Sequence, residues 1–376
     1  MVEPPLFLFG TLRHAPLLAL IAGEDDLHAR PALVRDMAVV HACSDGGGRA
    51  GPMLTPRQGA QAQGLLITPG AKARARIEAC LAAHDLSPAP IIVDSDAGAV
   101  QACHYLSSGA APGRDWSLEA WVAAHGDFAL ALAQEMMAHW PLMVAARYLP
   151  MLERRVASRL RAARQPAPCS QRRRAAEGDV QARQVRRPHQ GFFALDLADL
   201  RHRRFDGTLS PELHREGFVM ADAVTVLPYD ACADLVLLVE QFRLGPWLRG
   251  DPQPWMLEPI AGYIDAGESP EDAARREARE EAGLDLGALH RIGGYYPSPG
   301  AVSEFTHSFI ALASLDGKDG TIGGLEGEAE DIRAHVIAFD RLLALAPSGE
   351  LATGPLLLSV LWLEKHRERL RAEGLG

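Results

Sequence analysis

Three glutamates in one short segment are the residues of this sequence best suited to chemistry. Glu277, Glu280 and Glu281 are spaced so that a helix places their carboxylates on one strip, about one turn apart. Like charges at this spacing destabilise a helix unless they are neutralised, and a hard divalent cation such as Mg2+ is the usual partner of clustered carboxylates. A solvated helix face would need no ligand, so the glutamates alone leave both interpretations open.

The flanking residues predict where the helix begins and ends. Ser269 is typical of an N-cap, Pro270 fits the first helical position, and Asp272 is a carboxylate three residues after the cap. Gly283 fits the residue that follows a helix. We therefore expect a helix over 270–282. Its opposite side is predicted to pack closely on a sheet through small residues that recur every four positions: Ala274, Ala278 and Ala282.

The whole segment Gly262–Leu284 fits a longer pattern. It reads G-x5-E-x7-R-E-U-x-E-E-x-G-U, where U is an aliphatic or small apolar residue, and every fixed position is occupied. The sequence therefore resembles the Nudix hydrolases, whose box this is and which cleave a nucleoside diphosphate linked to another group. The box positions are Gly262, Glu268, Arg276, Glu277, Glu280, Glu281 and Gly283.

This resemblance implies a role for the box side chains. Glu277 and Glu281 would be metal ligands, Glu280 would be auxiliary, and Glu268 would form a structural ion pair with Arg276. Mg2+ is the implied cofactor, with Mn2+ as an alternative. The physical reason is that a metal neutralises the charge of a pyrophosphate, activates water and stabilises the leaving phosphate.

The flanks of the box are similar to the ADP-ribose pyrophosphatase branch of this family. The similar segments are Glu240–Arg243, Leu257–Gly262, and Pro299, which lies 16 residues after Gly283. An acidic loop, Gly324–Arg333, resembles the branch's source of a further metal ligand and a general base. The resemblance implies metal binding by the Ala261 carbonyl, Glu277, Glu281 and Glu330; catalysis by Glu328, Glu281 and Glu280; and substrate binding by Arg243, Glu258, Pro299, Gly300 and Glu304.

The implied reaction converts ADP-ribose and water to AMP and ribose 5-phosphate. The alternatives are hydrolysis of other nucleoside diphosphate sugars or dinucleotides, and a sensor that binds ADP-ribose without cleaving it. The intact box disfavours the sensor, since binding alone does not require every metal ligand. Arg243 as a strand-edge cation and the acidic loop as a solvated segment are the alternatives for the flanks. Glycines 323, 324 and 327 favour a mobile lid over the substrate.

The N-terminal segment Phe9, Gly10, Thr11 and Leu12 resembles the glycine turn of the gamma-glutamylcyclotransferase-like fold, an α/β barrel. Catalysis in that fold needs a buried carboxylate, and this chain offers Asp85 in place of the expected glutamate. A shorter side chain would misplace the carboxylate, so we expect a non-catalytic or divergent domain, with gamma-glutamyl cyclotransfer as the alternative. The two-domain combination resembles bacterial ADP-ribose pyrophosphatases associated with tellurite resistance, and this branch implies a homodimer.

The 376 residues predict two domains of an α+β chain. Residues 1–150 form the barrel domain, and 191–376 form the Nudix domain, which is expected to be an α/β/α sandwich with a mixed sheet. Residues 151–190 are an arginine-rich helix or linker, predicted to be a solvated face or, alternatively, part of an anion-binding or partner surface. Its eleven arginines are at positions 154, 155, 159, 161, 164, 172, 173, 174, 183, 186 and 187.

Composition excludes several classes of function. With 38 Lys+Arg against 48 Asp+Glu, the formal charge of −10 disfavours binding to nucleic acid or an anionic membrane, so a phosphate ligand would need local arginines or metal ions. Five widely spaced cysteines without a CxxC pair suggest neither a disulfide framework nor a zinc site. Neither a cleavable leader nor a long apolar stretch is evident, so a cytoplasmic protein is expected.

Overall fold

The computed structural model describes residues 3–43, 51–107, 111–166, 168–325, 327 and 330–374. The chain forms two compact units. Unit 1 comprises Met1–Val156 and Ala182–Ala198, and unit 2 comprises Ala157–Gln181 and Asp199–Gly376. Each unit has strands and a buried apolar core of its own.

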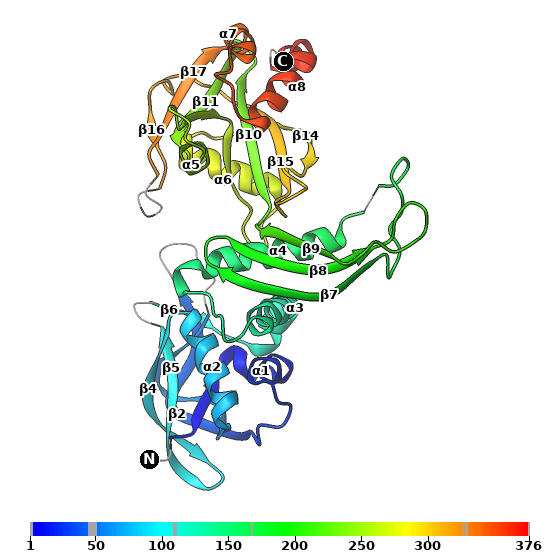
Figure 1. Cartoon of the computed structure of the whole chain (residues 1–376). Coiled ribbons are helices and arrows are strands. Elements are labelled where there is room, and N and C mark those ends of the chain that lie inside the picture. The colour runs from blue at the N-terminus through cyan, green and yellow to red at the C-terminus, as the bar shows by residue number, and fades with distance from the viewer. Residues whose placement is uncertain are drawn as a thin grey trace. The chain divides into compact units, whose positions relative to one another are not determined.

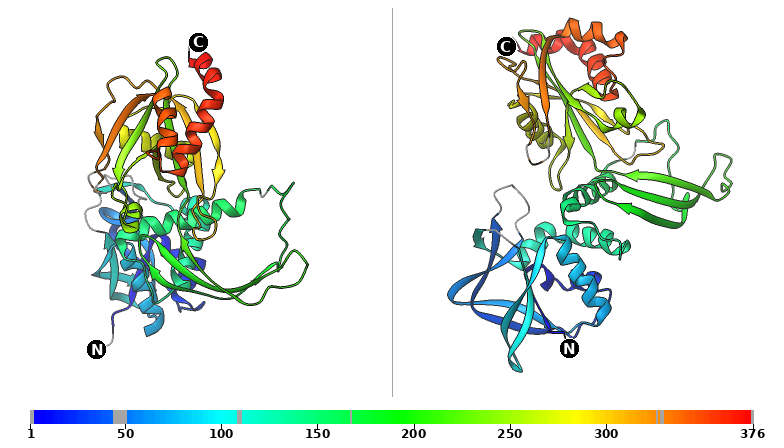
Figure 2. Two further views of the ribbon diagram at one scale, coloured as in Figure 1. Left: turned by 45° about the horizontal axis from the view of Figure 1, so that its top comes forward. Right: turned by 60° about the vertical axis from the view of Figure 1, so that its left-hand side comes forward.

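Unit 1 contains a closed five-stranded barrel (Figures 1 and 2). The strand order is β3-β1-β5-β4-β2, β2 pairs back onto β3, and β6 pairs with β2. Phe7, Val34, Leu66 and Val93 belong to its buried apolar cluster, as expected for a small barrel filled by side chains. The strands are β1 (Leu6–Phe9), β2 (Arg30–Cys43), β3 (Pro52–Ile67), β4 (Leu86–Ser95), β5 (Gly98–Ser107) and β6 (Ala111–Asp115). The predicted barrel is confirmed, while the gamma-glutamylcyclotransferase-like assignment stays a prediction.

The Phe9–Leu12 turn has a structural reason of its own. Gly10 follows β1 with a φ of 63°, and a Cβ at this position would lie 2.2 Å from Pro52 Cγ. Both the backbone conformation and the close packing therefore require glycine, whether or not the turn binds a ligand. The helical elements of this region are η1 (Gly10–Arg13), α1 (Ala15–Ala22), α2 (Ala71–Ala83), α3 (Leu118–Ala138) and η2 (Ala146–Tyr148).

Asp85 is not a buried carboxylate. It follows α2 with a φ of 56°, it is exposed, and its main-chain N–H donates to the Ala82 carbonyl. The residue therefore forms the turn after α2, and its carboxylate is not enclosed by the barrel. A divergent N-terminal domain remains our expectation.

The arginine-rich segment contributes to one helix and one strand. Residues Leu149–Arg164 form α4, and Val180–Gln190 form β7. Strand β7 belongs to a three-stranded sheet of order β7-β8-β9, with β8 (Ala194–His202) and β9 (Leu213–Val219).

Two of the eleven arginines are buried within unit 1. Arg155 is 2% exposed and donates to the main-chain carbonyls of Gly191 and Phe192. Arg187 forms an ion pair of 2.5 Å with Glu135, which is buried too. A solvated face is therefore the wrong interpretation for these two residues.

Unit 2 is built on a mixed sheet. Its main path is β14-β15-β10-β11-β17-β16, with β12 paired to β11 and β13 paired to β10. Strands β10 and β15 are parallel, and the other pairs are antiparallel. The strands are β10 (Ala223–Asp230), β11 (Leu235–Phe242), β12 (Trp255–Glu258), β13 (Ile260–Tyr263), β14 (Leu289–Tyr295), β15 (Thr306–Leu312), β16 (Ile322–Gly323) and β17 (Ile332–Ala338).

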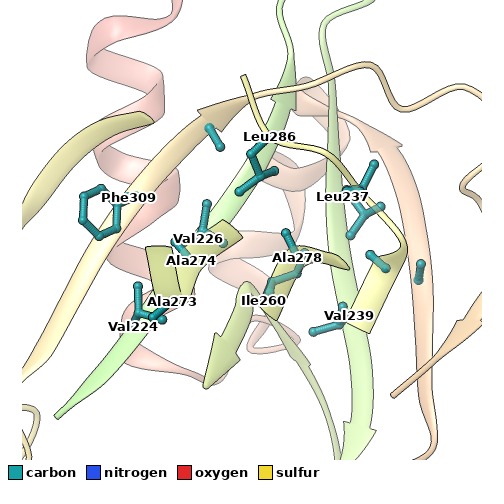
Figure 3. Close-up of a cluster of buried hydrophobic side chains, with 14 of the residues drawn as sticks. Val224, Val226, Leu237, Val239, Ile260, Ala273, Ala274, Ala278, Leu286 and Phe309 are labelled. Atoms are coloured by element: carbon teal, nitrogen blue, oxygen red, sulfur yellow. The ribbon is translucent and has the colours of Figure 1, made fainter. Parts of the chain in front are cut away.

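Helices cover both faces of this sheet. Strand residues alternate between the faces: Leu237 and Val239 pack toward α6 (Pro270–Ala282), as Figure 3 shows, whereas Leu238 lies in a second cluster with Val360 of α8 (Gly354–Gly374). The predicted α/β/α sandwich with a mixed sheet is therefore confirmed.

Among the helices of unit 2, two short ones were not predicted. They are α5 (Leu244–Arg249) and α7 (Phe339–Leu345), the latter followed by η4 (Ala346–Ser348). Helices of two turns or fewer contain too few repeats for apolar periodicity to reveal them. No helix in the described ranges combines the length and apolar character needed to span a bilayer.

Replacing Leu238 by alanine tests the two-layer core. Leu238 is 1% exposed, so the Leu238→Ala change should lower the free energy of unfolding by about 2–5 kcal/mol through lost burial and a residual cavity. Denaturant unfolding followed by circular dichroism measures this, and Leu361→Ala, at a residue that is 63% exposed, is the control. Equal effects of the two substitutions would contradict the assigned packing.

Candidate active site

Helix α6 begins and ends where the sequence predicts. The Ser269 hydroxyl accepts a hydrogen bond from the Asp272 N–H, and Pro270 occupies the first helical position. Gly283 has a φ of 58°, its N–H donates to the Arg279 carbonyl, and the next N–H donates to the Ala278 carbonyl. The bond from Gly283, which has a left-handed backbone, to Arg279 is the αL type of helix end, so the helix is stopped at both ends by local interactions.

One side of α6 is packed on the sheet. Ala274, Ala278 and Ala282 belong to the buried cluster, as predicted, together with Ala273 (Figure 3). Small side chains let the helix backbone approach the strands closely, and this approach also brings the nearby glutamates against the sheet. Glu281 is only 3% exposed, so the interpretation of a solvated acidic face is wrong for this residue.

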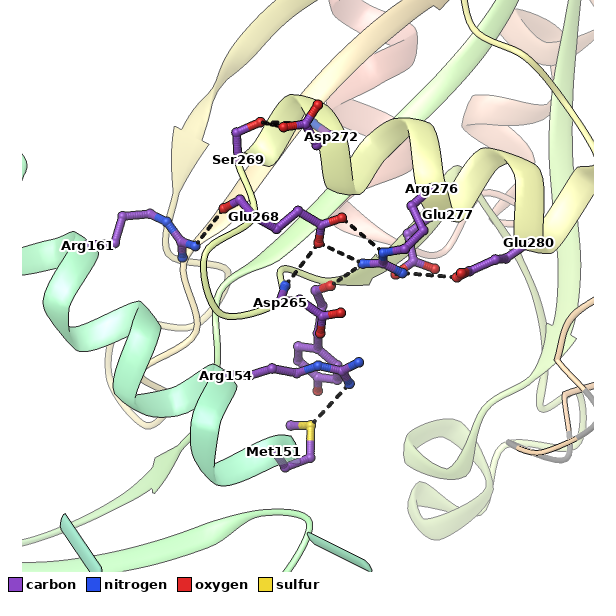
Figure 4. Close-up of polar contacts among 11 residues, drawn as sticks. Met151, Arg154, Arg161, Asp265, Glu268, Ser269, Asp272, Arg276, Glu277 and Glu280 are labelled. Atoms are coloured by element: carbon purple, nitrogen blue, oxygen red, sulfur yellow. Dashed lines mark hydrogen bonds and ion pairs between the residues drawn. The ribbon is translucent and has the colours of Figure 1, made fainter. Parts of the chain in front are cut away.

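Arg276 connects the loop before α6 to the glutamates on it (Figure 4). Its Nε and Nη2 each donate to Glu268 at 3.0 Å, which confirms the predicted ion pair. Its Nη1 also donates to Glu277 at 2.7 Å and to Glu280 at 3.0 Å. Burial lowers the pKa of Arg276, but the ion pairs with Glu268 and Glu277 outweigh it, so the net shift is upward. The contacts with Glu277 and Glu280 were not predicted from the sequence.

Glu277 is pressed against the strand that precedes the box. A Cβ added to Gly262 would lie 1.9 Å from Glu277 Oε1, so only glycine leaves room for this carboxylate. Burial raises the pKa of Glu277 to about 7, Glu280 and Glu330 add to the rise, and Arg276 opposes it. Glycine at the box position 262 therefore has a direct role in seating Glu277.

Glu281 is the most deeply buried of the three helix carboxylates. Burial raises its pKa well above the ordinary value, and the charges of Glu277 and Glu330 raise it further. The Arg243 charge and a backbone hydrogen bond at Ala261 act in the opposite direction. Glu281 Oε2 is buried and has no hydrogen-bond partner among the described residues. This oxygen requires a partner that the described part of the chain does not supply.

The acidic loop packs on the C-terminal end of α6. A Cβ on Gly323 would lie 1.9 Å from the Glu281 carbonyl oxygen, and the Gly324 N–H donates to the Glu280 carbonyl. Packing therefore explains why glycine stands at positions 323 and 324, independently of the mobile lid that the sequence predicted. The Leu325 N–H donates to Glu330 Oε2 at 3.2 Å, which holds Glu330 near the helix carboxylates. The predicted base Glu328 lies outside the described residues.

Arg243 and Glu258 face each other. Arg243 lies between β11 and α5, and its Nε donates to Glu258 Oε2 at 2.7 Å. The Arg243 side chain keeps 39% of its surface exposed, against 14% for Glu258. An exposed guanidinium that also acts electrostatically on Glu281 lies where an anion near the glutamates would meet it.

The residues downstream of the box that were predicted to bind substrate lie in the segment between β14 and β15. Pro299 and Gly300 lie exposed in the turn between β14 and β15. Glu304 accepts a hydrogen bond from the Thr306 hydroxyl at 3.1 Å, and burial raises its pKa. The charge that acts on Glu304 is Asp222, which the sequence did not single out.

The donor set fits a hard divalent cation. Glu277, Glu281 and Glu330 interact electrostatically, all donors are oxygens, and one of these oxygens is buried without a partner. A divalent cation would remove the repulsion among the carboxylates and satisfy that oxygen.

A second group of possible metal ligands lies near β8 and β9. The donor atoms of Asp199, Glu212 and His214 are within 4.8 Å of one another. This group contains none of the predicted ligands, and His214 Nδ1 already lies 2.6 Å from Asp199 Oδ1.

Substituting Gly262 by alanine tests the seat of Glu277. The new Cβ should displace the carboxylate and weaken Mn2+ binding by about 10- to 100-fold, as is typical when the support of a ligand is removed. Stability should change little, since the colliding atoms are the end of a flexible side chain. Gly293→Ala, at a strand position with open space, is the control for Mn2+ titrations. Wild-type affinity in Gly262→Ala would refute the assigned seat.

The raised pKa of Glu277 predicts pH-dependent metal binding. In the metal-free protein its carboxyl holds a proton up to about pH 7, where an ordinary glutamate is already ionised. A cation must displace that proton and the proton of Glu281, whose pKa is also raised, so affinity should fall by up to about tenfold per pH unit for each proton below pH 7. Mn2+ titrations between pH 6 and 8 measure this, and Glu277→Gln should remove the dependence on the Glu277 proton. Constant affinity of the wild type across that range would contradict the prediction.

Comparison with known proteins identifies the C-terminal region. The NUDIX domain family matches residues 220–356. The ADP-ribose pyrophosphatase of Escherichia coli (strain K12) is 39% identical over 186 residues, which cover 49% of this chain and 88% of that protein. The ADP-ribose pyrophosphatase of Haemophilus influenzae is 34% identical, with 49% and 85% covered. The GDP-mannose pyrophosphatase of Salmonella arizonae is 38% identical, with 40% and 76% covered. With the box residues assembled around Arg276 and so much of these relatives matched, the chain belongs to the Nudix family.

Proposed function

We propose that the chain hydrolyses the pyrophosphate bond of ADP-ribose to give AMP and ribose 5-phosphate, with Mg2+ as its divalent cation. The observation that carries the proposal is the interacting group Glu277, Glu281 and Glu330, in which one buried oxygen has no partner among the described residues. The 39% identity to an ADP-ribose pyrophosphatase supports this substrate. A pyrophosphate repels a nucleophile, so its cleavage benefits from such a metal site.

The proposed ligands are the carboxylates of Glu277, Glu281 and Glu330 and the carbonyl of Ala261. When bound, the cation neutralises the charge of the pyrophosphate and polarises water. Glu280 is auxiliary and shares Arg276 with Glu277. Glu328 is the proposed general base that accepts the proton of the attacking water.

Arg243 is proposed to bind the substrate phosphates. Its guanidinium can present two N–H groups to two oxygens at once, and its present partner, Glu258, would then be free to contact the sugar. Pro299, Gly300 and Glu304 are the further proposed contacts to the substrate.

The remaining expectations concern the whole protein. We propose a homodimer in the cytoplasm and a barrel domain that does not carry out cyclotransfer. A connection with tellurite resistance belongs to the same proposal. A mass measurement in solution and an assay for 5-oxoproline release test the first and the second of these expectations.

A second substrate has a specific observation in its favour. The chain is 38% identical to a GDP-mannose pyrophosphatase over 149 residues, so another nucleoside diphosphate sugar is the main competitor of ADP-ribose. The competing substrates differ in base and sugar but share the pyrophosphate, so the metal site would serve either one.

Hydrolysis assays with Mg2+ or Mn2+ test the proposal. The purified chain should release AMP from ADP-ribose faster than it releases GMP from GDP-mannose. Glu281→Gln should lower kcat/KM by about 1,000-fold or more, because a metal contributes several kcal/mol to the transition state. Glu271→Gln, at an exposed position of the same helix, is the control.

Each other outcome has a distinct meaning. Undiminished turnover by Glu281→Gln would refute the metal site, and faster cleavage of GDP-mannose would change the substrate. Binding of ADP-ribose without release of AMP would favour the sensor.

A further inference from the structure

A buried carboxylate attaches helix α4 to the Nudix box. Asp222 immediately precedes β10 and is 4% exposed, so its charge needs close partners. Both of its oxygens find them on α4: the Ser158 hydroxyl donates at 2.5 Å, and Arg161 Nη1 donates at 2.6 Å. Ser158 and Arg161 are three residues apart, so they lie on one face of the helix.

The Asp222 main chain and the Arg161 side chain contact the box loop at its two ends. At the start of the loop, the Ile264 N–H donates to the main-chain carbonyl of Asp222. At its end, Arg161 Nη2 donates to the main-chain carbonyl of Glu268 at 3.4 Å (Figure 4). Arg161 is thus a bridge between the buried Asp222 and the residue that precedes the N-cap of α6.

The Glu268 side chain continues this connection to the helix glutamates. It holds Arg276 through two hydrogen bonds of 3.0 Å. Arg276 in turn holds Glu277 at 2.7 Å and Glu280 at 3.0 Å. An uninterrupted series of polar contacts therefore leads from Arg161, through the loop, to the carboxylates on α6 (Figure 4).

If Arg161 only stabilised the fold, its ion pair with Asp222 would be sufficient. Neutralising Asp222 requires one positive charge and docks α4, but it does not require a second contact on the loop. The contact with the Glu268 carbonyl uses the other arm of the guanidinium fork, which a lysine cannot reproduce while it remains on Asp222. A lysine at position 161 could therefore not hold both groups at once.

We propose that Arg161 is a positioning residue of the Nudix box, which fixes the box loop and so orients Glu277 and Glu280 through Glu268 and Arg276. The proposal rests on the metal-dependent function proposed above. It assigns a role to part of the arginine-rich segment that neither its charge nor its composition indicates.

Full-length variants separate positioning from stability. Arg161→Lys keeps a charge for Asp222 and loses the fork, so its unfolding midpoint should stay near the wild-type value while Mn2+ affinity falls about 5- to 10-fold, near the lower range for indirect supports of a metal ligand. Arg164→Met, at an exposed position of the same helix, should leave both quantities unchanged.

A double variant keeps the test valid if the single change destabilises the protein. Arg161→Met alone leaves Asp222 buried without its cation, whereas Arg161→Met with Asp222→Asn removes both charges and should regain stability. Its Mn2+ affinity should remain low, since the contact with the Glu268 carbonyl is still missing. In hydrolysis assays, the Mg2+ concentration for half-maximal rate should rise in parallel for both variants.

Mn2+ binding measured without substrate distinguishes the failure of this proposal from that of the proposed function. Wild-type affinity in Arg161→Lys and in the double variant would overturn the positioning role, whatever their activity. A wild-type protein that binds no Mn2+ would overturn it too. A wild-type protein that binds Mn2+ but cleaves no nucleotide sugar would refute the function alone, and weaker binding in the variants would still support positioning.

Discussion

The repulsion among neighbouring buried carboxylates is the constraint on which the C-terminal unit depends. Glu281 is almost fully buried, Glu277 lies one turn before it, and Glu330 acts on both from the acidic loop. Burial removes the water that would screen these charges, so the pKa values of Glu277 and Glu281 are raised. Arg276 compensates Glu277 and Glu280, whereas Glu281 keeps an oxygen without a partner among the described residues. The divalent cation proposed above would resolve the remaining repulsion and give that oxygen a partner.

The packing of the fold brings these carboxylates close together. Small residues on α6 bring the helix close to the sheet, Gly262 leaves room for the Glu277 carboxylate, and Gly323 lets the acidic loop reach the Glu281 backbone. A larger residue at either glycine would move a carboxylate or the loop. The α/β/α core therefore positions the carboxylates and the acidic loop, and the polar contacts of Arg276 and Arg161 refine those positions.

Local signals in the sequence were sufficient for the helix and its ends, because Ser269, Pro270 and Gly283 act within one turn of the positions they define. The Glu268–Arg276 pair followed from the box pattern, and the sandwich with its mixed sheet followed from the resemblance to the Nudix hydrolases. The link from α4 to Asp222 did not, since a buried partner far along the chain leaves no periodic trace. For the same reason, two arginines assigned to a solvated segment turned out to be buried. The helices α5 and α7 escaped detection because they are too short to show apolar periodicity.

Anomalous diffraction from crystals grown with Mn2+ tests the central claim most directly, since it locates the cation without relying on activity. The account predicts a peak enclosed by the carboxylates of Glu277, Glu281 and Glu330. A peak at Asp199, Glu212 and His214 instead, or none beside Glu281, would contradict it.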